Sequence, residues 1–145
     1  MIRSFDAELV NSIVNDPSVR PHVGGDGTSY IDLTAIVEDD KNHAILGPHG
    51  GFLCTWSAPE TYEIHTFILP DGRGPEAAAL ALATRDYLEG IGATHLWTRV
   101  EKTMENVRKF TLAAGFKPCG EQTLDLGGGP TAYELFNWRP SCQQQ

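Results

Sequence analysis

Positive charge, cysteine and long apolar runs are all scarce in this sequence. Its 145 residues include 11 Lys and Arg against 19 Asp and Glu, which gives a formal net charge of −8. Proteins that bind nucleic acids generally present a basic surface, and this charge balance argues against one. We therefore expect no nucleic-acid partner.

The 3 cysteines, Cys54, Cys119 and Cys142, lie far apart and form neither a CxxC metal motif nor a disulfide framework. The 5 histidines show no spacing typical of metal ligands, so no metal site is expected. No apolar run reaches the about 18 residues of a membrane-spanning helix, and no segment has the pattern of a signal peptide. These absences favour a cytoplasmic protein without a membrane partner.

Strand-like and helix-like segments alternate clearly along the chain. The length and the 41% of hydrophobic residues suit one domain, expected over residues 1–145 with a frayed end over 137–145. Strands interrupted by single helices predict a mixed α/β sheet with helices on both faces. Segment 31–37 suits a strand or a short helix, and the pattern does not decide between them. The other periodic segments predict helices over 6–16, 74–89 and 103–114, and strands over 42–47, 51–57, 61–70, 94–100, 116–122 and 131–138.

The strand expected over 61–70 carries the candidate catalytic residues. Side chains alternate between the two faces of a strand, so Glu63 and His65 lie on the same face. An imidazole with an ordinary pKa of about 6.5 can transfer protons at neutral pH. A hydrogen-bonded histidine within the sheet and a solvent-facing glutamate are the alternatives, and the sequence leaves them open.

The turn "LPDGRGPEAAALA", residues 69–81, leads from this strand into the next helix. A glycine-rich turn in this place aims free backbone N–H groups and the helix dipole at a phosphate. The same turn also suits a plain helix start, because Pro75 fits the first helical position and the dipole favours Glu76 there. Both interpretations of the turn remain open.

Three stretches, in this order and at these spacings, resemble the GNAT acyltransferase superfamily. They are "ILPDGRG" at the end of a strand, the helix that leaves through "YLEGIGATHLW", and "NVRKFTLAAGFKPCGE", a helix that ends in Gly-Phe and runs into a strand. The resemblance covers roughly residues 42–138. It implies a fold of the acyl-CoA N-acyltransferase type, in which helices cover both faces of a mixed, mostly antiparallel sheet.

The resemblance also implies acetyl-CoA as a cosubstrate, together with the residues that bind it. Backbone groups of the fourth strand would pair with the pantetheine arm, and the turn after it would hold the pyrophosphate. In this sequence the pantetheine residues are Phe67, Ile68 and Leu69, and the pyrophosphate residues are Arg73, Gly74, Ala77 and Ala78. Glu63 or His65 would remove a proton from an amine, directly or through water, so that its nitrogen attacks the thioester.

The chain departs from this pattern at several positions. Glu76 stands where the turn is expected to have glycine, and it brings bulk and negative charge to a phosphate site. Pro75 removes one N–H donor. Met104 takes the place of an asparagine, and Thr111 the place of a tyrosine that protonates the leaving thiolate. A threonine hydroxyl is a far weaker acid than a phenol.

Several functions therefore remain open. The first is an acetyl-CoA-dependent N-acetyltransferase that acts on an unidentified small amine or protein amine. The second is a catalytically inactive bacteriophage protein, because "YEIHTFILPDGRGPEAAALA" and "GFKPCGE" also resemble GNAT-like proteins of tailed phages. Such a protein would serve virion assembly and bind phage structural proteins, in the host cytoplasm or in the virion. The third is a regulator that binds CoA but transfers no acetyl group. Apart from these functions, the resemblance implies a homodimer as a candidate assembly.

Overall fold

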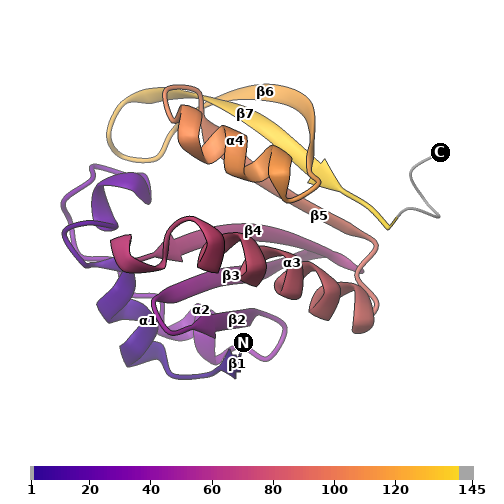
Figure 1. The fold of residues 1–145 in the computed structure, drawn as a ribbon. Helices are drawn as coiled ribbons and strands as arrows, with labels where there is room; N and C mark the ends of the chain where they lie inside the picture. The colour runs from indigo at the N-terminus through magenta and orange to yellow at the C-terminus, as the bar shows by residue number, and fades with distance from the viewer. Residues whose placement is uncertain (1, 141–145) are drawn as a thin grey trace.

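The computed structural model describes residues 2–140 (Figure 1). No helix in this part of the chain is long and apolar enough to cross a membrane. The same residues contain no group of three or more His, Cys, Asp or Glu side chains that could hold a metal ion. Cys142 and the end of the expected tail, 141–145, lie outside the described residues. The elements are β1 (Ile2–Ser4), α1 (Ala7–Val14), the 3-10 helix η1 (Arg20–His22), α2 (Thr34–Glu38), β2 (His43–Gly47), β3 (Gly50–Ala58), β4 (Thr61–Ile68), the 3-10 helix η2 (Pro70–Gly72), α3 (Pro75–Gly90), β5 (His95–Glu101), α4 (Glu105–Ala113), β6 (Lys117–Asp125) and β7 (Pro130–Trp138).

The strands form one seven-stranded sheet in the order β1-β2-β3-β4-β5-β7-β6. All neighbouring strands are antiparallel except β4 and β5, which are parallel. Parallel neighbours need a crossover connection, and α3 supplies it between β4 and β5. The predicted mixed, mostly antiparallel sheet is confirmed.

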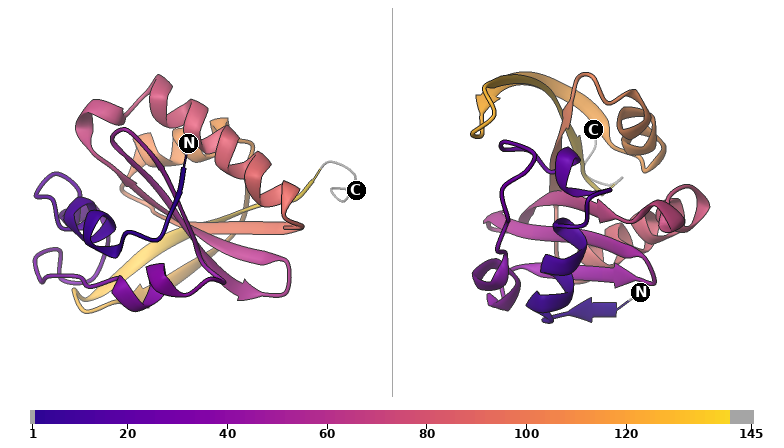
Figure 2. Two further views of the ribbon diagram at one scale, coloured as in Figure 1. Left: turned by 90° about the horizontal axis from the view of Figure 1, so that it is seen from below. Right: turned by 90° about the vertical axis from the view of Figure 1, so that its left-hand side faces the viewer.

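Helices cover both faces of the sheet, as predicted. In Figure 2, α1 and α2 lie on one side of the sheet, and α3 and α4 lie on the other. Val14 of α1 and Leu53 of β3 are buried in the core on the first side. Leu88 of α3 and Leu96 of β5 are buried in the core on the second side, where Phe110 of α4 packs against them. The two cores hold β3 and β4 between them.

Some local details differ from the sequence-based prediction. β1 is absent from that prediction, because three residues are too short to show a period, and the strand exists through its pairing with β2. Segment 31–37, which the pattern left open, leads into the short helix α2. The helix expected over 103–114 spans Glu105–Ala113: the Thr103 hydroxyl donates to Glu101 at 3.2 Å, and Met104 is the N-cap residue. β7 includes Asn137 and Trp138, so it continues into the segment expected to be frayed.

Candidate active site

β4 and β5 separate just beyond a short paired stretch. Parallel pairing joins residues 61–63 of β4 to residues 95–97 of β5. Both strands then continue, to Ile68 and to Glu101, without further pairing to each other. The Thr98 hydroxyl donates to the Ile64 carbonyl at 2.8 Å where the strands part. Beyond this point the edges of two strands face each other. An extended ligand can add to such an edge through main-chain hydrogen bonds.

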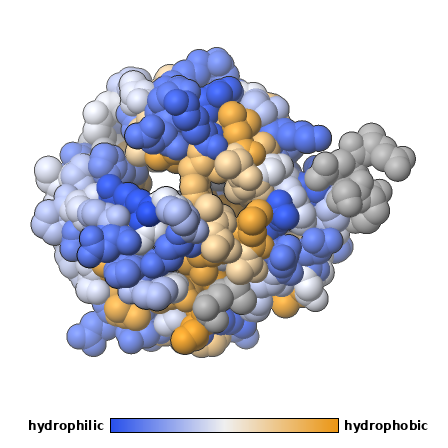
Figure 3. Space-filling model, in the orientation of Figure 1, coloured by the Kyte–Doolittle hydropathy of each residue, from blue (hydrophilic) through white to orange (hydrophobic). Residues whose placement is uncertain are grey.

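A cleft of about 920 Å³ opens between the separated strands. α3 and α4 line it on one side of the sheet, and Gly24 and Leu126 line it from the loops after η1 and between β6 and β7. Figure 3 shows an opening between the upper part of the molecule, which contains α4, β6 and β7, and the rest. A cleft of this size accommodates a cofactor-sized ligand.

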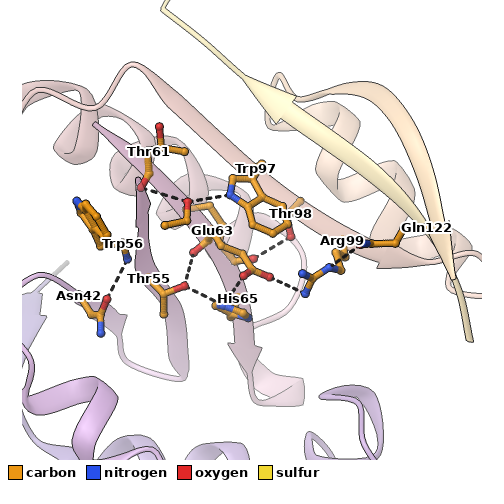
Figure 4. A network of polar contacts seen from close by, with 12 residues as sticks. Asn42, Thr55, Trp56, Thr61, Glu63, His65, Trp97, Thr98, Arg99 and Gln122 are labelled. Atoms are coloured by element: carbon orange, nitrogen blue, oxygen red, sulfur yellow. Dashed lines mark hydrogen bonds and ion pairs between the residues drawn. The ribbon is translucent and has the colours of Figure 1, made fainter. Parts of the chain in front are cut away.

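Glu63 forms the centre of a polar network on the face of β4 that also carries His65 (Figure 4). Oε2 of Glu63 lies 3.0 Å from Nη1 of Arg99 on β5, and Oε1 lies 3.7 Å from Nε2 of His65. Arg99 also donates through Nε to Gln122 on β6 at 3.2 Å, and its guanidinium lies 5.0 Å from the ring centroid of Trp97. Glu63 is therefore a carboxylate held in place by a charged partner.

His65 is the member of this network best suited to accept a proton. Its Nε2 lies 3.2 Å from Oγ1 of Thr55 on β3, and its ring stacks against Phe67 with 6.5 Å between centroids. Burial lowers the pKa of His65 below its ordinary value, the charge of Glu63 opposes this shift, and the charge of Arg99 adds to it. At pH 7 the imidazole is therefore neutral and has a lone pair available for a proton.

The turn between β4 and α3 brings backbone amides to the cleft. Gly74 is the N-cap of α3 with a φ of 88°, a left-handed conformation that favours glycine, and Pro75 is the first helical residue. A Cβ atom at Gly74 would meet no atom within 4 Å, so the space beside the turn is open. The first-turn amides of Glu76 and Ala77 have no partner within the helix. These features fit a pyrophosphate group, which the dipole of α3 would also attract.

The structure brings most of the predicted cofactor residues to the cleft. Those that line it are Phe67, Ile68, Arg73, Gly74 and Ala77. Ala78 is exposed and does not line the cleft, and its N–H donates to the Gly74 carbonyl at 3.0 Å. Leu69 does not line this cleft either, and its N–H donates to the His49 carbonyl at 2.9 Å. The backbone N–H groups of Leu69 and Ala78 are therefore already bonded within the protein.

Arg73 lines the cleft, but its guanidinium is bonded to protein carbonyls. Nε donates to the Ile68 carbonyl at 3.3 Å, and Nη2 donates to the Ser18 carbonyl at 3.0 Å. These bonds tie the turn to the end of β4 and to the segment after α1. Arg73 therefore braces the turn and adds positive charge beside it.

Three residues around Glu63 are absent from the sequence-based prediction: Arg99, which lines the cleft, and Thr55 and Trp97, which adjoin Glu63 on the neighbouring strands. Glu63 is paired in register with Thr55 on β3 and with Trp97 on β5. Side chains in register on neighbouring strands lie side by side on one face of a sheet. Alternation along β5 then places Arg99 on the same face as Trp97. The sequence therefore shows that Arg99 lies beside Glu63 only once the pairing of β4 with β5 is known.

Met104 and Thr111 line the cleft from the side of α4. Thr111 is buried, and its hydroxyl donates to the Val107 carbonyl at 2.8 Å. Its proton is therefore engaged within the helix, and α4 contains no tyrosine in its place. This helix offers no acid for a leaving thiolate.

Comparison with solved structures shows that this architecture is that of GNAT-family acetyltransferases. The chain is similar to an acetyltransferase of the GNAT family from Bacillus anthracis, with a TM-score of 0.69 and 17% identity over 94% of this chain and 90% of the other. It is also similar to an IAA acetyltransferase from Bacillus cereus, with a TM-score of 0.65 and 12% identity over 96% and 97% of the two chains. A Bacillus subtilis acetyltransferase in complex with CoA gives a TM-score of 0.55 and 10% identity over 70% and 79%. No family model matches the sequence, and no curated protein matches it.

Proposed function

We propose that this protein is an acetyl-CoA-dependent N-acetyltransferase that acts on a small amine or on an amine of a protein. The proposal depends on one observation: a single cleft, opened by the separation of β4 and β5, is lined by the N-terminal turn of α3 and by Glu63 and His65. The fold supports the proposal, and so does the CoA bound to a structure that shares it.

The cosubstrate would lie along the cleft. Backbone amides at the start of α3 would hold the pyrophosphate, with Arg73 adding positive charge. The edge of β4 that faces the cleft would pair with the pantetheine arm near Ile68, through backbone groups that do not face β3. Acetyl-CoA supplies the acetyl group: the amine nitrogen forms an amide bond to the acetyl carbon while the carbon–sulfur bond breaks and the thiolate leaves.

His65 would act as the general base in this reaction. Its neutral imidazole takes the proton that the amine nitrogen loses, because only the unprotonated amine attacks the thioester. Glu63, held by Arg99, stabilises the imidazolium that forms. Thr111 does not supply the proton for the thiolate, because its hydroxyl is bonded within α4, so the thiolate takes a proton from another group in the cleft or from solvent.

Isothermal titration calorimetry with acetyl-CoA and with CoA tests the proposal. We expect a Kd on the order of 1–10 μM, which corresponds to about −7 to −8 kcal/mol. Gly74→Asp places a negative charge in the open space beside the turn and should abolish binding. Gly74→Ala is the matched control, since it brings the same backbone strain without the charge. A wild-type protein that binds neither ligand at millimolar concentration would overturn the proposal.

The alternative is a catalytically inactive protein of this fold, such as a structural protein of a phage particle. The missing acid at Thr111 favours it. Turnover separates the two: a panel of amines is incubated with protein and acetyl-CoA, and the released thiol is measured. Release that depends on both the amine and His65 supports the enzyme. Absence of CoA binding, together with copurification with virion proteins, supports the structural role.

A further inference from the structure

Glu76, which stands where the cofactor turn is expected to have glycine, is held outside the cleft. Its Oε1 and Oε2 atoms lie 3.1 and 3.0 Å from Nδ1 of His49, in the turn between β2 and β3. An ionised carboxylate only accepts hydrogen bonds, so the imidazole donates through Nδ1–H. Gly74 and Ala77, on either side of Glu76 in the chain, line the cleft, and Glu76 does not. Its side chain therefore leaves the turn in a different direction from the proposed pyrophosphate site.

Packing around Gly72 brings His49 and Glu76 together. A Cβ atom at Gly72 would lie 2.5 Å from Cβ of His49 and 2.8 Å from Oε2 of Glu76, so only glycine leaves room for this contact. The Leu69 N–H also donates to the His49 carbonyl at 2.9 Å. The turn between β2 and β3 therefore holds both the backbone of the cofactor turn and the carboxylate that would otherwise be free.

The position of Glu76 in α3 explains why the hydrogen bonds from His49 to its carboxylate matter. Glu76 lies in the first turn of α3, where the free amides and the helix dipole attract negative charge. His49 is the one side chain among the described residues that bonds its carboxylate. Without that bond, the carboxylate would turn toward the amides of its own helix terminus. It would then compete with a pyrophosphate and repel it, because two negative charges would share one site.

We propose that His49 is a positioning residue for the cosubstrate: by holding the Glu76 carboxylate away from the N-terminus of α3, it keeps the backbone amides there free for the pyrophosphate of CoA. This inference rests on the proposed binding of acetyl-CoA. It accounts for a turn that carries glutamate in place of glycine and still presents an open anion site. His49 and Glu76 then act as one unit, in which the loss of the histidine harms binding only while the glutamate is present.

A double-mutant cycle tests this coupling. CoA is titrated into wild type, His49→Ala, Glu76→Ala and the double variant by calorimetry, with thermal unfolding to check that each is folded. We expect His49→Ala to weaken CoA binding by about tenfold, equivalent to ~1.4 kcal/mol. Glu76→Ala should bind at least as tightly as wild type, and the double variant should match Glu76→Ala. His49→Ala combined with Glu76→Gln should be rescued as well, since the amide keeps the size of the side chain and removes its charge.

Acetyl-pantetheine, which lacks the pyrophosphate, gives a second readout. It should bind wild type and His49→Ala equally, whereas general damage to the cleft would weaken it in the variant. Wild-type affinity for CoA in His49→Ala, or a double variant as weak as His49→Ala alone, would overturn the inference and leave the proposed function standing. Failure of the wild-type protein itself to bind CoA would overturn both, and that result appears before any variant is made.

Discussion

The carboxylate of Glu63 on β4 lies 3.0 Å from the guanidinium of Arg99 on β5, and this ion pair connects the two strands at the point where they separate. The two side chains are only 16% and 27% exposed, so water screens the pair incompletely. With Glu63 held by Arg99, the neutral imidazole of His65 beside the cleft can take a proton. The geometry thus separates the two candidate catalytic residues into a base and its charged neighbour.

Replacing His65 by alanine removes the proposed base. General base catalysis contributes typically 10²–10⁴-fold, so kcat should fall by about that factor. The affinity for acetyl-CoA should stay close to the wild-type value, because His65 does not belong to the turn at α3. Thiol release with an accepted amine measures the first effect, and calorimetry measures the second. Glu63→Gln, which keeps the shape of the side chain, should lower kcat less. Wild-type turnover in His65→Ala would remove the base assignment.

The rate should depend on pH in a way that identifies His65. Burial lowers the pKa of His65 below the ordinary value of about 6.5. The neutral form therefore predominates at pH 7 and is lost as the pH falls through the lowered pKa. We expect the contribution of the base to kcat/KM to be near its full value above neutral pH and to decline as the pH falls through the lowered pKa. The folded state loses stability as the pH falls from about 6.5, where the unfolded chain takes up the proton, down to the lowered pKa of the folded state. A base-dependent decline that begins well above pH 7 would contradict the assignment.

Loss of the Arg99 charge should destabilise the fold through Glu63. Arg99→Met leaves a half-buried carboxylate without its cation, and we expect a loss of about 1–2 kcal/mol in the free energy of unfolding, measured in urea. Adding Glu63→Gln should recover part of it. Lys102→Met is the control, because Lys102 and Glu121 pair while 43% and 67% exposed, and the expected loss is below about 0.5 kcal/mol. Equal losses in the two single variants would show that burial of the Glu63 pair has no special effect.

An added methyl group at Gly72 should disturb both stability and the cofactor turn. Gly72→Ala forces Cβ against His49 and Glu76, and overpacking of this kind costs about 1–3 kcal/mol. CoA affinity should fall as well, because Glu76 loses its partner. Gly90→Ala at the other end of α3 is the matched control: its Cβ meets nothing within 4 Å, and alanine in a helix gains roughly 0.5–1 kcal/mol over glycine. Thermal unfolding and calorimetry compare the two, and an unperturbed Gly72→Ala would contradict the tight packing.

Local patterns in the sequence were sufficient for most of the fold. Strands and helices repeat their buried positions every two and about 3.6 residues, so β2 to β7, α1, α3 and α4 appear as periodic segments. The face shared by Glu63 and His65 follows from the same alternation. β1 was beyond this approach, because its three residues become a strand only by pairing with β2. The start of α4 was also missed, since Thr103 bonds Glu101 instead of the helix.

Short-range patterns are enough to show which side chains share a face and where a glycine-rich turn enters a helix, because both depend on neighbours a few residues away. The partners of those side chains depend on long-range packing. Glu63 meets Arg99, 36 residues further along the chain, because β4 and β5 are parallel and in register. Glu76 meets His49, 27 residues earlier, because the turn between β2 and β3 packs on Gly72. The negative charge of Glu76 is unfavourable for a phosphate site only if its side chain points into that site. Long-range packing against His49 directs the side chain away from it.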